Sequence, residues 1–303
     1  MLVEHVVKQY GQCHAVDDLS FRVQTGDIFA LLGPNGAGKT TMLEILEGYR
    51  QADAGNVRVL GLDPQRDAAR LKSRVGLMLQ QGGVYPAITA GEALALFASF
   101  YAHPASPEAL LEQVGLMAVR RTRFRRLSGG QQRRLALAIA LIGQPELVFL
   151  DEPTAGMDPQ ARQLTWSIVR GLKERGATVV LTTHLMDEAQ RLADHVAIID
   201  HGALLAIGTP QQLLAVRNDV PTALHLTLSA PVDQAALAAL SGVTLVRLDG
   251  PASYHIEAED PAAVAATVTA WLRDNNHVLH ELRIGSSSLE DVFLQLTGTD
   301  VRE

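Results

Sequence analysis

Short, continuous apolar segments recur through the first two-thirds of the chain and alternate with helical patterns. Four of these segments are apolar on both faces, at residues 28–32, 75–79, 147–150 and 179–182. Strands that are covered by helices on both sides of a sheet have this character. Their alternation with helices predicts an α/β fold with a mostly parallel sheet.

Other strand candidates mix polar and apolar positions, at residues 3–10, 21–23 and 57–60. Residues 196–199 and 203–207 are two further strands, and the Asp-His-Gly sequence between them predicts a hairpin. We therefore expect an antiparallel flank beside the parallel core. Residues near 104–126 are helical in pattern and polar enough to form a separate lobe, and a loop leads into one helix at residues 90–102.

The pattern changes near residues 217–221, where turn residues follow a helix and predict a domain boundary. The remaining residues, 221–303, give the order β-α-β-β-α-β of a ferredoxin-like unit, a small α+β accessory domain. The last helix carries an apolar stripe of Leu289, Val292, Phe293 and Leu296. Two interpretations stay open: burial within its own domain, or self-association with a second copy.

Composition narrows the class of protein. The chain has 303 residues, 47% of them hydrophobic, which suits about two globular domains. Cys13 is the single cysteine, so no intrachain disulfide can form, as suits a reducing compartment. The net charge of -7 argues against a protein that coats nucleic acid. No apolar run approaches the ~20 residues of a spanning helix, and the N-terminal segment is typical of a strand, so we expect the chain to be soluble by itself.

A glycine-rich loop lies between the strand at 28–32 and a helix predicted from residue 41. It matches the G-x-x-x-x-G-K-[ST] pattern. Its glycines let successive backbone N–H groups converge on an anion at the positive end of a helix. Lys39 can then reach the β- and γ-phosphates, and the Thr40 hydroxyl can bind Mg²⁺. The predicted nucleotide-binding residues are Gly33, Pro34, Asn35, Gly36, Ala37, Gly38, Lys39, Thr40 and Thr41.

Two carboxylates follow the apolar strand at 147–150. In an open parallel sheet, strand ends of this kind face the ligand crevice. Asp151 can orient Mg²⁺ or a water bound to it, and Glu152 can polarise a water aimed at the γ-phosphate. Together with the glycine-rich loop, this pair predicts hydrolysis of a nucleoside triphosphate.

A second anion-binding surface precedes an apolar helix. Ser128 can cap this helix, while Gly129 and Gly130 leave backbone N–H groups open, and Gln131 completes the motif. A capped helix start with flexible glycines is the simpler alternative. One nucleotide cannot easily use both surfaces of one subunit, so the pair makes sense if the nucleotide lies between two copies arranged head to tail.

With these motifs in the order GPNGAGKT, LSGGQ and LVFLDE, the chain resembles the nucleotide-binding subunit of ATP-binding-cassette transporters over about its first 215 residues. The resemblance implies a cassette at residues 1–217 that binds and hydrolyses ATP with Mg²⁺ as a homodimer. It extends the helical lobe to about residues 84–140. It implies an integral membrane permease as partner, with the chain cytoplasmic and peripheral on the inner face of the membrane. No nucleic acid is expected as a partner.

Four further positions follow from the resemblance. Tyr10 matches the aromatic residue on which adenine stacks, although it could instead be a core tyrosine. Gln80 matches the glutamine that contacts Mg²⁺ and the attacking water, with Gln81 as the alternative, which makes Thr40, Gln80 and Asp151 the predicted Mg²⁺ ligands. His184 matches the histidine that contacts the γ-phosphate and aligns Glu152. Asp158 matches an aspartate that links the two halves of the dimer.

The segment AGMDP and the C-terminal segment SSSLEDVFLQLTG are similar to the corresponding segments in ATPases of drug, antibiotic or lipid exporters, including the daunorubicin-resistance type. The alternative is a cassette ATPase that acts on ribosomes or DNA. Such proteins typically carry two cassettes or large insertions, whereas this sequence has one phosphate loop. The guanine-reading motif Asn-Lys-x-Asp does not occur, which argues against a GTPase.

Overall fold

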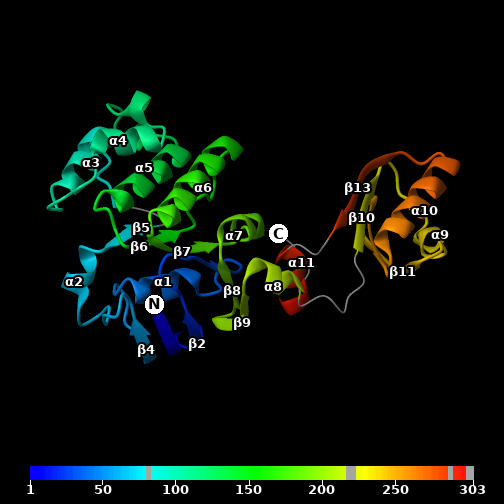
Figure 1. Ribbon diagram of the computed structural model, residues 1–303, viewed down its shortest axis with the longest axis horizontal. Coiled ribbons are helices and arrows are strands. Elements are labelled where there is room, and N and C mark those ends of the chain that lie inside the picture. Colours follow the sequence, from blue (N-terminus) through cyan, green and yellow to red (C-terminus); the bar gives the residue numbers. More distant parts are fainter. Residues whose placement is uncertain (80–82, 216–222, 286–288, 298–303) are drawn as a thin grey trace. The chain divides into compact units, whose positions relative to one another are not determined.

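The computed structural model describes residues 1–79, 83–215, 223–285 and 289–297 (Figure 1). The chain forms two compact units, Met1–Pro210 and Gln211–Glu303. The domain boundary predicted at residues 217–221 falls in a segment outside the described residues, so it stays a prediction.

A six-stranded sheet forms the centre of the first unit, in the order β5-β6-β7-β3-β8-β9. All neighbours pair in parallel except β8 and β9, the antiparallel hairpin predicted at its edge. Every residue of β3, β6 and β7 is buried, which confirms the parallel core. The bounds are Ile28–Leu32 (β3), Val75–Met78 (β5), Leu147–Asp151 (β6), Thr178–Thr183 (β7), His195–Asp200 (β8) and Ala203–Gly208 (β9).

The predicted antiparallel flank is a separate sheet in the order β2-β1-β4. Its strands are Leu2–Tyr10 (β1), Cys13–Arg22 (β2) and Ala54–Arg58 (β4). The strand predicted at 21–23 is therefore wrong in length. The rest of β2 is not evident from the sequence. Its pairing with β1 shifts register three times, and this breaks the regular alternation of polar and apolar residues. The Phe21 ring stacks on Phe29 of the central sheet at 5.1 Å, so the two sheets share one core.

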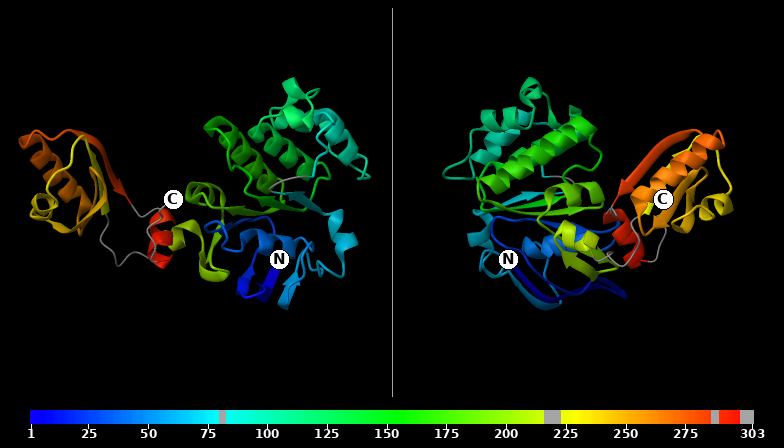
Figure 2. Two further views of the ribbon diagram at one scale, coloured as in Figure 1. Left: turned by 180° about the vertical axis from the view of Figure 1, so that it is seen from behind. Right: turned by 45° about the vertical axis from the view of Figure 1, so that its right-hand side comes forward.

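Helices pack beside the central sheet, and α3, α4 and α5 form the predicted lobe (Figure 2). The helix predicted at 90–102 ends earlier, at Ala98, where the Ser99 hydroxyl donates to the Leu96 carbonyl. The bounds are Lys39–Leu46 (α1), Ala68–Lys72 (α2), Ala90–Ala98 (α3), Pro107–Gln113 (α4), Gly129–Leu141 (α5), Pro159–Glu174 (α6) and Met186–Leu192 (α7), with 3₁₀ turns at Met117–Val119 and Phe124–Arg126. The next helix, Pro210–Ala215 (α8), begins at the boundary between the two units.

The C-terminal sheet is antiparallel, in the order β11-β12-β10-β13. This is the ferredoxin-like arrangement predicted from the sequence, in which a third strand separates the two strands of each β-α-β unit. Apolar residues of one sheet face pack against α9 and α10. The bounds are Ala223–Leu228 (β10), Gln234–Ala238 (α9), Val243–Gly250 (β11), Ser253–Ala258 (β12), Pro261–Asp274 (α10), Leu279–Gly285 (β13) and Leu289–Thr297 (α11).

Three residues of the predicted stripe on α11, Leu289, Val292 and Phe293, are buried, while Leu296 at the end of the stripe is 41% exposed. Most of the stripe is therefore buried within the chain, outside the core that α9 and α10 share with the C-terminal sheet, and self-association stays a prediction.

Within the described ranges, no helix has both the length and the apolar character needed to cross a membrane.

Candidate nucleotide site

The glycine-rich loop is held in place by the strands beside it. Gly36 and Gly38 have φ values of 83° and 97°, a left-handed conformation that side chains disfavour. A Cβ on Gly38 would lie 2.0 Å from the Ala15 carbonyl oxygen, and one on Gly33 would lie 2.2 Å from the Ile199 carbonyl oxygen. The backbone of the loop is therefore fixed by β2 and β8, and α1 begins at once with Lys39.

Lys39 folds back into the loop that precedes it. Its Nζ donates to the Gly33 and Pro34 carbonyl oxygens at 2.7 and 2.8 Å, and the side chain is only 5% exposed. Burial lowers the pKa of Lys39, although Glu152 and Asp151 oppose this shift. The ammonium is thus held within the loop, with backbone carbonyls as its partners.

The remaining loop residues complete the cradle. The buried Ala37 donates its N–H to the Pro34 carbonyl oxygen at 3.2 Å and accepts a hydrogen bond from Gly202 at 3.1 Å. Asn35 is exposed, and Thr41 lies in the first turn of α1. The structure brings all nine predicted nucleotide-binding residues of this segment together.

Asp151 ends β6 directly beside the first turn of α1. The Thr40 hydroxyl donates to Asp151 Oδ2 at 3.1 Å, and the Thr182 hydroxyl of the neighbouring β7 donates to Oδ1. Burial raises the pKa of Asp151, and these two hydrogen bonds counteract the shift. A threonine hydroxyl and a carboxylate are hard oxygen donors of the kind that Mg²⁺ binds, so the residues present fit that ion.

Glu152 and His184 meet at adjacent strand ends. His184 Nδ1 lies 3.1 Å from Glu152 Oε1, and Lys39 Nζ lies 3.9 Å from the same oxygen. Glu152 has a φ of 47°, which is costly for a residue with a side chain. Its N–H donates to the Thr182 hydroxyl at 3.0 Å, which helps to hold this conformation. The positive φ of Glu152 and its contacts with His184 and Lys39 therefore together set the orientation of the carboxylate.

One contact at this site is not indicated by the sequence. Arg133 Nη1 of α5 donates to the Glu152 carbonyl oxygen at 2.6 Å. This bond ties the helix that follows Ser128 to the backbone of Glu152. A backbone carbonyl has no sequence signature, so only the position of Arg133 soon after the LSGGQ motif could have drawn attention to it.

Glu188 is a second unpredicted residue near the site. It is 1% exposed and accepts hydrogen bonds from the Thr154 hydroxyl at 2.8 Å and from Trp166 Nε1 at 3.0 Å. Thr154 follows Glu152 by two residues. Glu188 therefore joins the segment after β6 to α6 and α7.

Ser128 caps α5, as its sequence predicts. Gln131 N–H donates to Ser128 Oγ at 3.3 Å, and Ser128 N–H donates to Gln131 Oε1 at 2.9 Å. A Cβ on Gly129 would meet nothing within 4 Å, and one on Gly130 would meet only Met157 at 3.9 Å. In the described part of the chain, no hydrogen bond joins this helix start to the loop at 33–40. Its open face is therefore free to contact another molecule.

The other predicted residues have mixed placements. Tyr10 ends β1 and is 42% exposed, so it is not a core tyrosine; the Arg50 guanidinium carbon lies 5.2 Å from its ring centre. Asp158 caps α6 by accepting the Ala161 N–H at 2.9 Å. Gln80 and Gln81 lie outside the described residues.

Comparison with known proteins agrees with this geometry. Residues 16–155 match the family model described as ABC transporter. The chain is 39% identical to the Nod factor export ATP-binding protein I of Ralstonia nicotianae, over 99% of this chain and 94% of that protein. It is 36% identical to the daunorubicin/doxorubicin resistance ATP-binding protein of Streptomyces peucetius, over 97% and 91% of the two chains. It is 34% identical to the linearmycin resistance ATP-binding protein of Bacillus subtilis, over 99% of both.

Among solved structures, a dimeric ATP-binding cassette in a post-hydrolysis state with bound ADP and Pi is similar to this chain. The TM-score is 0.64 at 25% identity, covering 69% of this chain and 97% of that one. Full-length relatives and the matching cassette lead to the same conclusion: the chain belongs to the ABC transporter family and is an ATP-binding subunit that hydrolyses ATP.

Proposed function

We propose that two copies of this chain enclose ATP between them and that hydrolysis reopens the dimer. Residues 33–40 of one copy would hold the phosphates, and Ser128, Gly129, Gly130 and Gln131 of the other would contact them from the opposite side. Support comes from the capped start of α5, whose glycines leave backbone N–H groups uncovered. A ligand that binds the closed form better than the open form can drive such a change.

The single observation that carries the proposal is the pairing of Glu152 with His184 beside Lys39. Glu152 would polarise the attacking water, and His184 and Gln80 would position it. Lys39 would exchange the Gly33 and Pro34 carbonyls for phosphate oxygens. Thr40, Gln80 and Asp151 would hold Mg²⁺, which neutralises charge on the phosphates when bound. Positioning and charge neutralisation supply most of the catalysis in phosphoryl transfer.

A separate membrane permease would be the partner, with the chain on the cytoplasmic face. A groove of about 320 Å³ supports this role, because it has an apolar lining shared by the lobe and the central sheet. Phe100, which is 69% exposed, contributes to the lining. Glu47 also lines it, and burial raises its pKa to about 8, with Asp151 and Glu44 adding to the shift. An apolar groove of this kind suits a helix of a partner protein.

The transported compound would be a drug, antibiotic, lipid or similar molecule moved out of the cell. This rests on the names of relatives that match almost the full chain, which concern Nod factor export and resistance to daunorubicin, doxorubicin and linearmycin.

The direct test is Glu152→Gln. We expect this variant to bind ATP with Mg²⁺, to accumulate as a dimer and to hydrolyse ATP at least about 100-fold more slowly than the parent, because the water loses its base. Sedimentation with ATP measures the dimer, and phosphate release measures turnover.

Glu174→Gln is the matched control, since Glu174 is an exposed acid on α6, away from the site. It should keep the parent's turnover. Unimpaired hydrolysis by Glu152→Gln would remove Glu152 from the catalytic role.

A further inference from the structure

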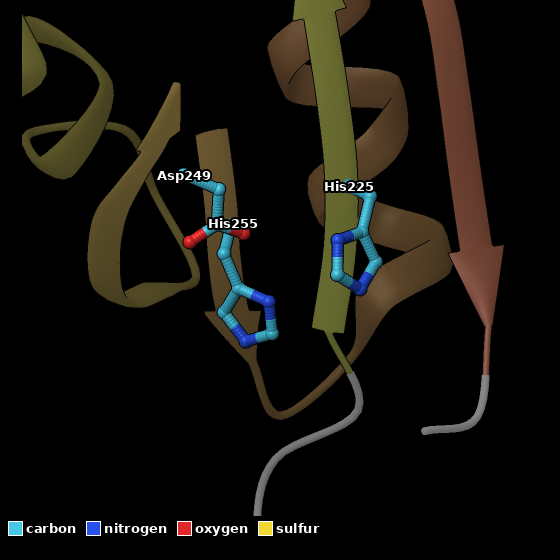
Figure 3. A group of neighbouring side chains, drawn as sticks. All are labelled: His225, Asp249 and His255. Atoms are coloured by element: carbon cyan, nitrogen blue, oxygen red, sulfur yellow. The ribbon is translucent and has the colours of Figure 1, made fainter. Parts of the chain in front are cut away.

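Two histidines face each other on the C-terminal sheet, far along the chain from the nucleotide site. His225 of β10 and His255 of β12 are direct cross-strand partners in the antiparallel register. Their ring centres lie 4.8 Å apart, with the ring planes at 80°. Figure 3 shows the two imidazoles side by side, with Asp249 above His255.

Asp249 reaches this pair from a third strand, β11. The register of β11 against β12 shifts between Leu248 and Gly250, on either side of Asp249. One ligand atom from each of His225, Asp249 and His255 lies within 4.8 Å of the others. Three strands therefore place two imidazole nitrogens and a carboxylate oxygen close to one another.

The surroundings of the three side chains suit an ion. His255 is buried, His225 is half-buried and Asp249 is exposed, so the group has a desolvated end and an open route to solvent. Among the described residues, no hydrogen bond engages either imidazole ring. Rings without hydrogen-bond partners keep their nitrogens available to a ligand.

A further carboxylate lies near His255, outside the group of three side chains. The Glu257 carboxylate lies 3.9 Å from His255 Nε2 and 3.9 Å from Arg247 Nη2, so it is shared with a cation already present. At 3.9 Å the Glu257 carboxylate is beyond hydrogen-bond distance of the ring, so a small movement on ion binding would be needed before it could orient a metal-bound histidine.

We propose that His225, His255 and Asp249 bind a divalent transition-metal ion of the Zn²⁺ class. Imidazole and carboxylate donors suit such ions, and three protein ligands leave a fourth position for water. Bonds of about 2.0–2.1 Å place tetrahedral ligands roughly 3.4 Å apart, so binding draws the three side chains together by about an ångström. The bound ion would cross-link β10, β11 and β12.

The test uses the full chain, stripped with a chelator and free of nucleotide, so that ATP cannot compete for the ion. Zn²⁺ is titrated by calorimetry, and Co²⁺ is titrated by its visible absorption. The proposal predicts one ion per chain, a Co²⁺ spectrum typical of tetrahedral nitrogen and oxygen ligands, and a higher unfolding midpoint with Zn²⁺.

Two substitutions and one control decide the location. His225→Ala and Asp249→Asn should each weaken binding at least about 10-fold. Asp249 is exposed, so Asp249→Asn should keep the fold, which circular dichroism checks. His280→Ala is the control, because His280 is an exposed histidine of β13 in the same sheet, and it should leave affinity unchanged. Absence of binding, or binding that survives both substitutions, would overturn the proposal.

Discussion

The cassette and the C-terminal domain differ in whether their buried polar side chains have hydrogen-bond partners. In the cassette, the side chains of Lys39, Asp151 and Glu152 are buried and each has a hydrogen-bond partner. In the described part of the C-terminal unit, the Tyr254 hydroxyl is bonded to the backbone of Val232, but the ring of the buried His255 lacks such bonds. Burying a polar group without partners is costly. The side chains of the first site are therefore held by hydrogen bonds in the absence of ligand, whereas those of the second lie close together without such bonds.

We expect the greatest loss of stability from a substitution at Gly38, in the constrained backbone of the nucleotide loop. Gly38→Ala should lower the free energy of unfolding by at least about 3 kcal/mol, because the new Cβ meets the Ala15 carbonyl and the residue must keep a positive φ. Gly129→Ala makes the matched change where a Cβ has open space, so stability should shift by less than about 1 kcal/mol while ATP-dependent dimerisation is lost. Urea unfolding and sedimentation measure the two effects. Equal destabilisation by both changes would show that the loop is not specially constrained.

The next effect concerns Glu47, whose pKa is raised to about 8 in the folded chain from an ordinary value of 4.5. The folded state therefore holds a proton that the unfolded state has lost, and stability falls as the pH rises from about 4.5 through 8. Glu47→Gln should remove this decline and add on the order of a few kcal/mol above pH 8. Unfolding curves across this pH range measure it; a parent and variant with parallel pH profiles would contradict the assignment.

The smallest effect concerns Arg133, a positioning residue that holds the Glu152 carbonyl. Arg133→Gln should slow turnover about 10-fold and leave ATP affinity unchanged, because the lost charged hydrogen bond aims Glu152 without touching nucleotide. Arg133→Lys should restore part of the rate. Arg134→Gln is the control, since Arg134 donates to the Val114 carbonyl of the lobe instead. A loss of ATP affinity as large as the loss of rate would mean that Arg133 acts on the fold and not on Glu152.

The sequence predicts most of the cassette because its chemistry is local. Gly33, Gly38 and Lys39 are recognisable from their spacing alone, and the order of strands then places Asp151 nearby. The pairing of Glu152 with His184 followed from the family resemblance. The bond from Arg133 to a carbonyl oxygen was unpredictable, because any residue supplies that acceptor.

In the C-terminal domain, the fold can be predicted from the sequence, but the group of neighbouring side chains cannot. Its element order predicts the fold, since each strand and helix follows its own pattern. The meeting of His225, His255 and Asp249 depends on sheet order and on a register shift in β11, which local patterns do not encode. The full length of β2 escaped prediction for the same reason.

Mixing two inactive variants shows whether each nucleotide is shared by two copies of the chain. Lys39→Ala lacks the phosphate contact, and Ser128→Arg blocks the opposite surface, so each alone should fail to dimerise or to hydrolyse ATP. A mixed dimer would keep one intact site, formed by Lys39 of one copy and Ser128 of the other. We predict ATP-dependent dimers and partial hydrolysis only in the mixture. A mixture as inactive as its components, or full activity of Ser128→Arg alone, would contradict a shared site.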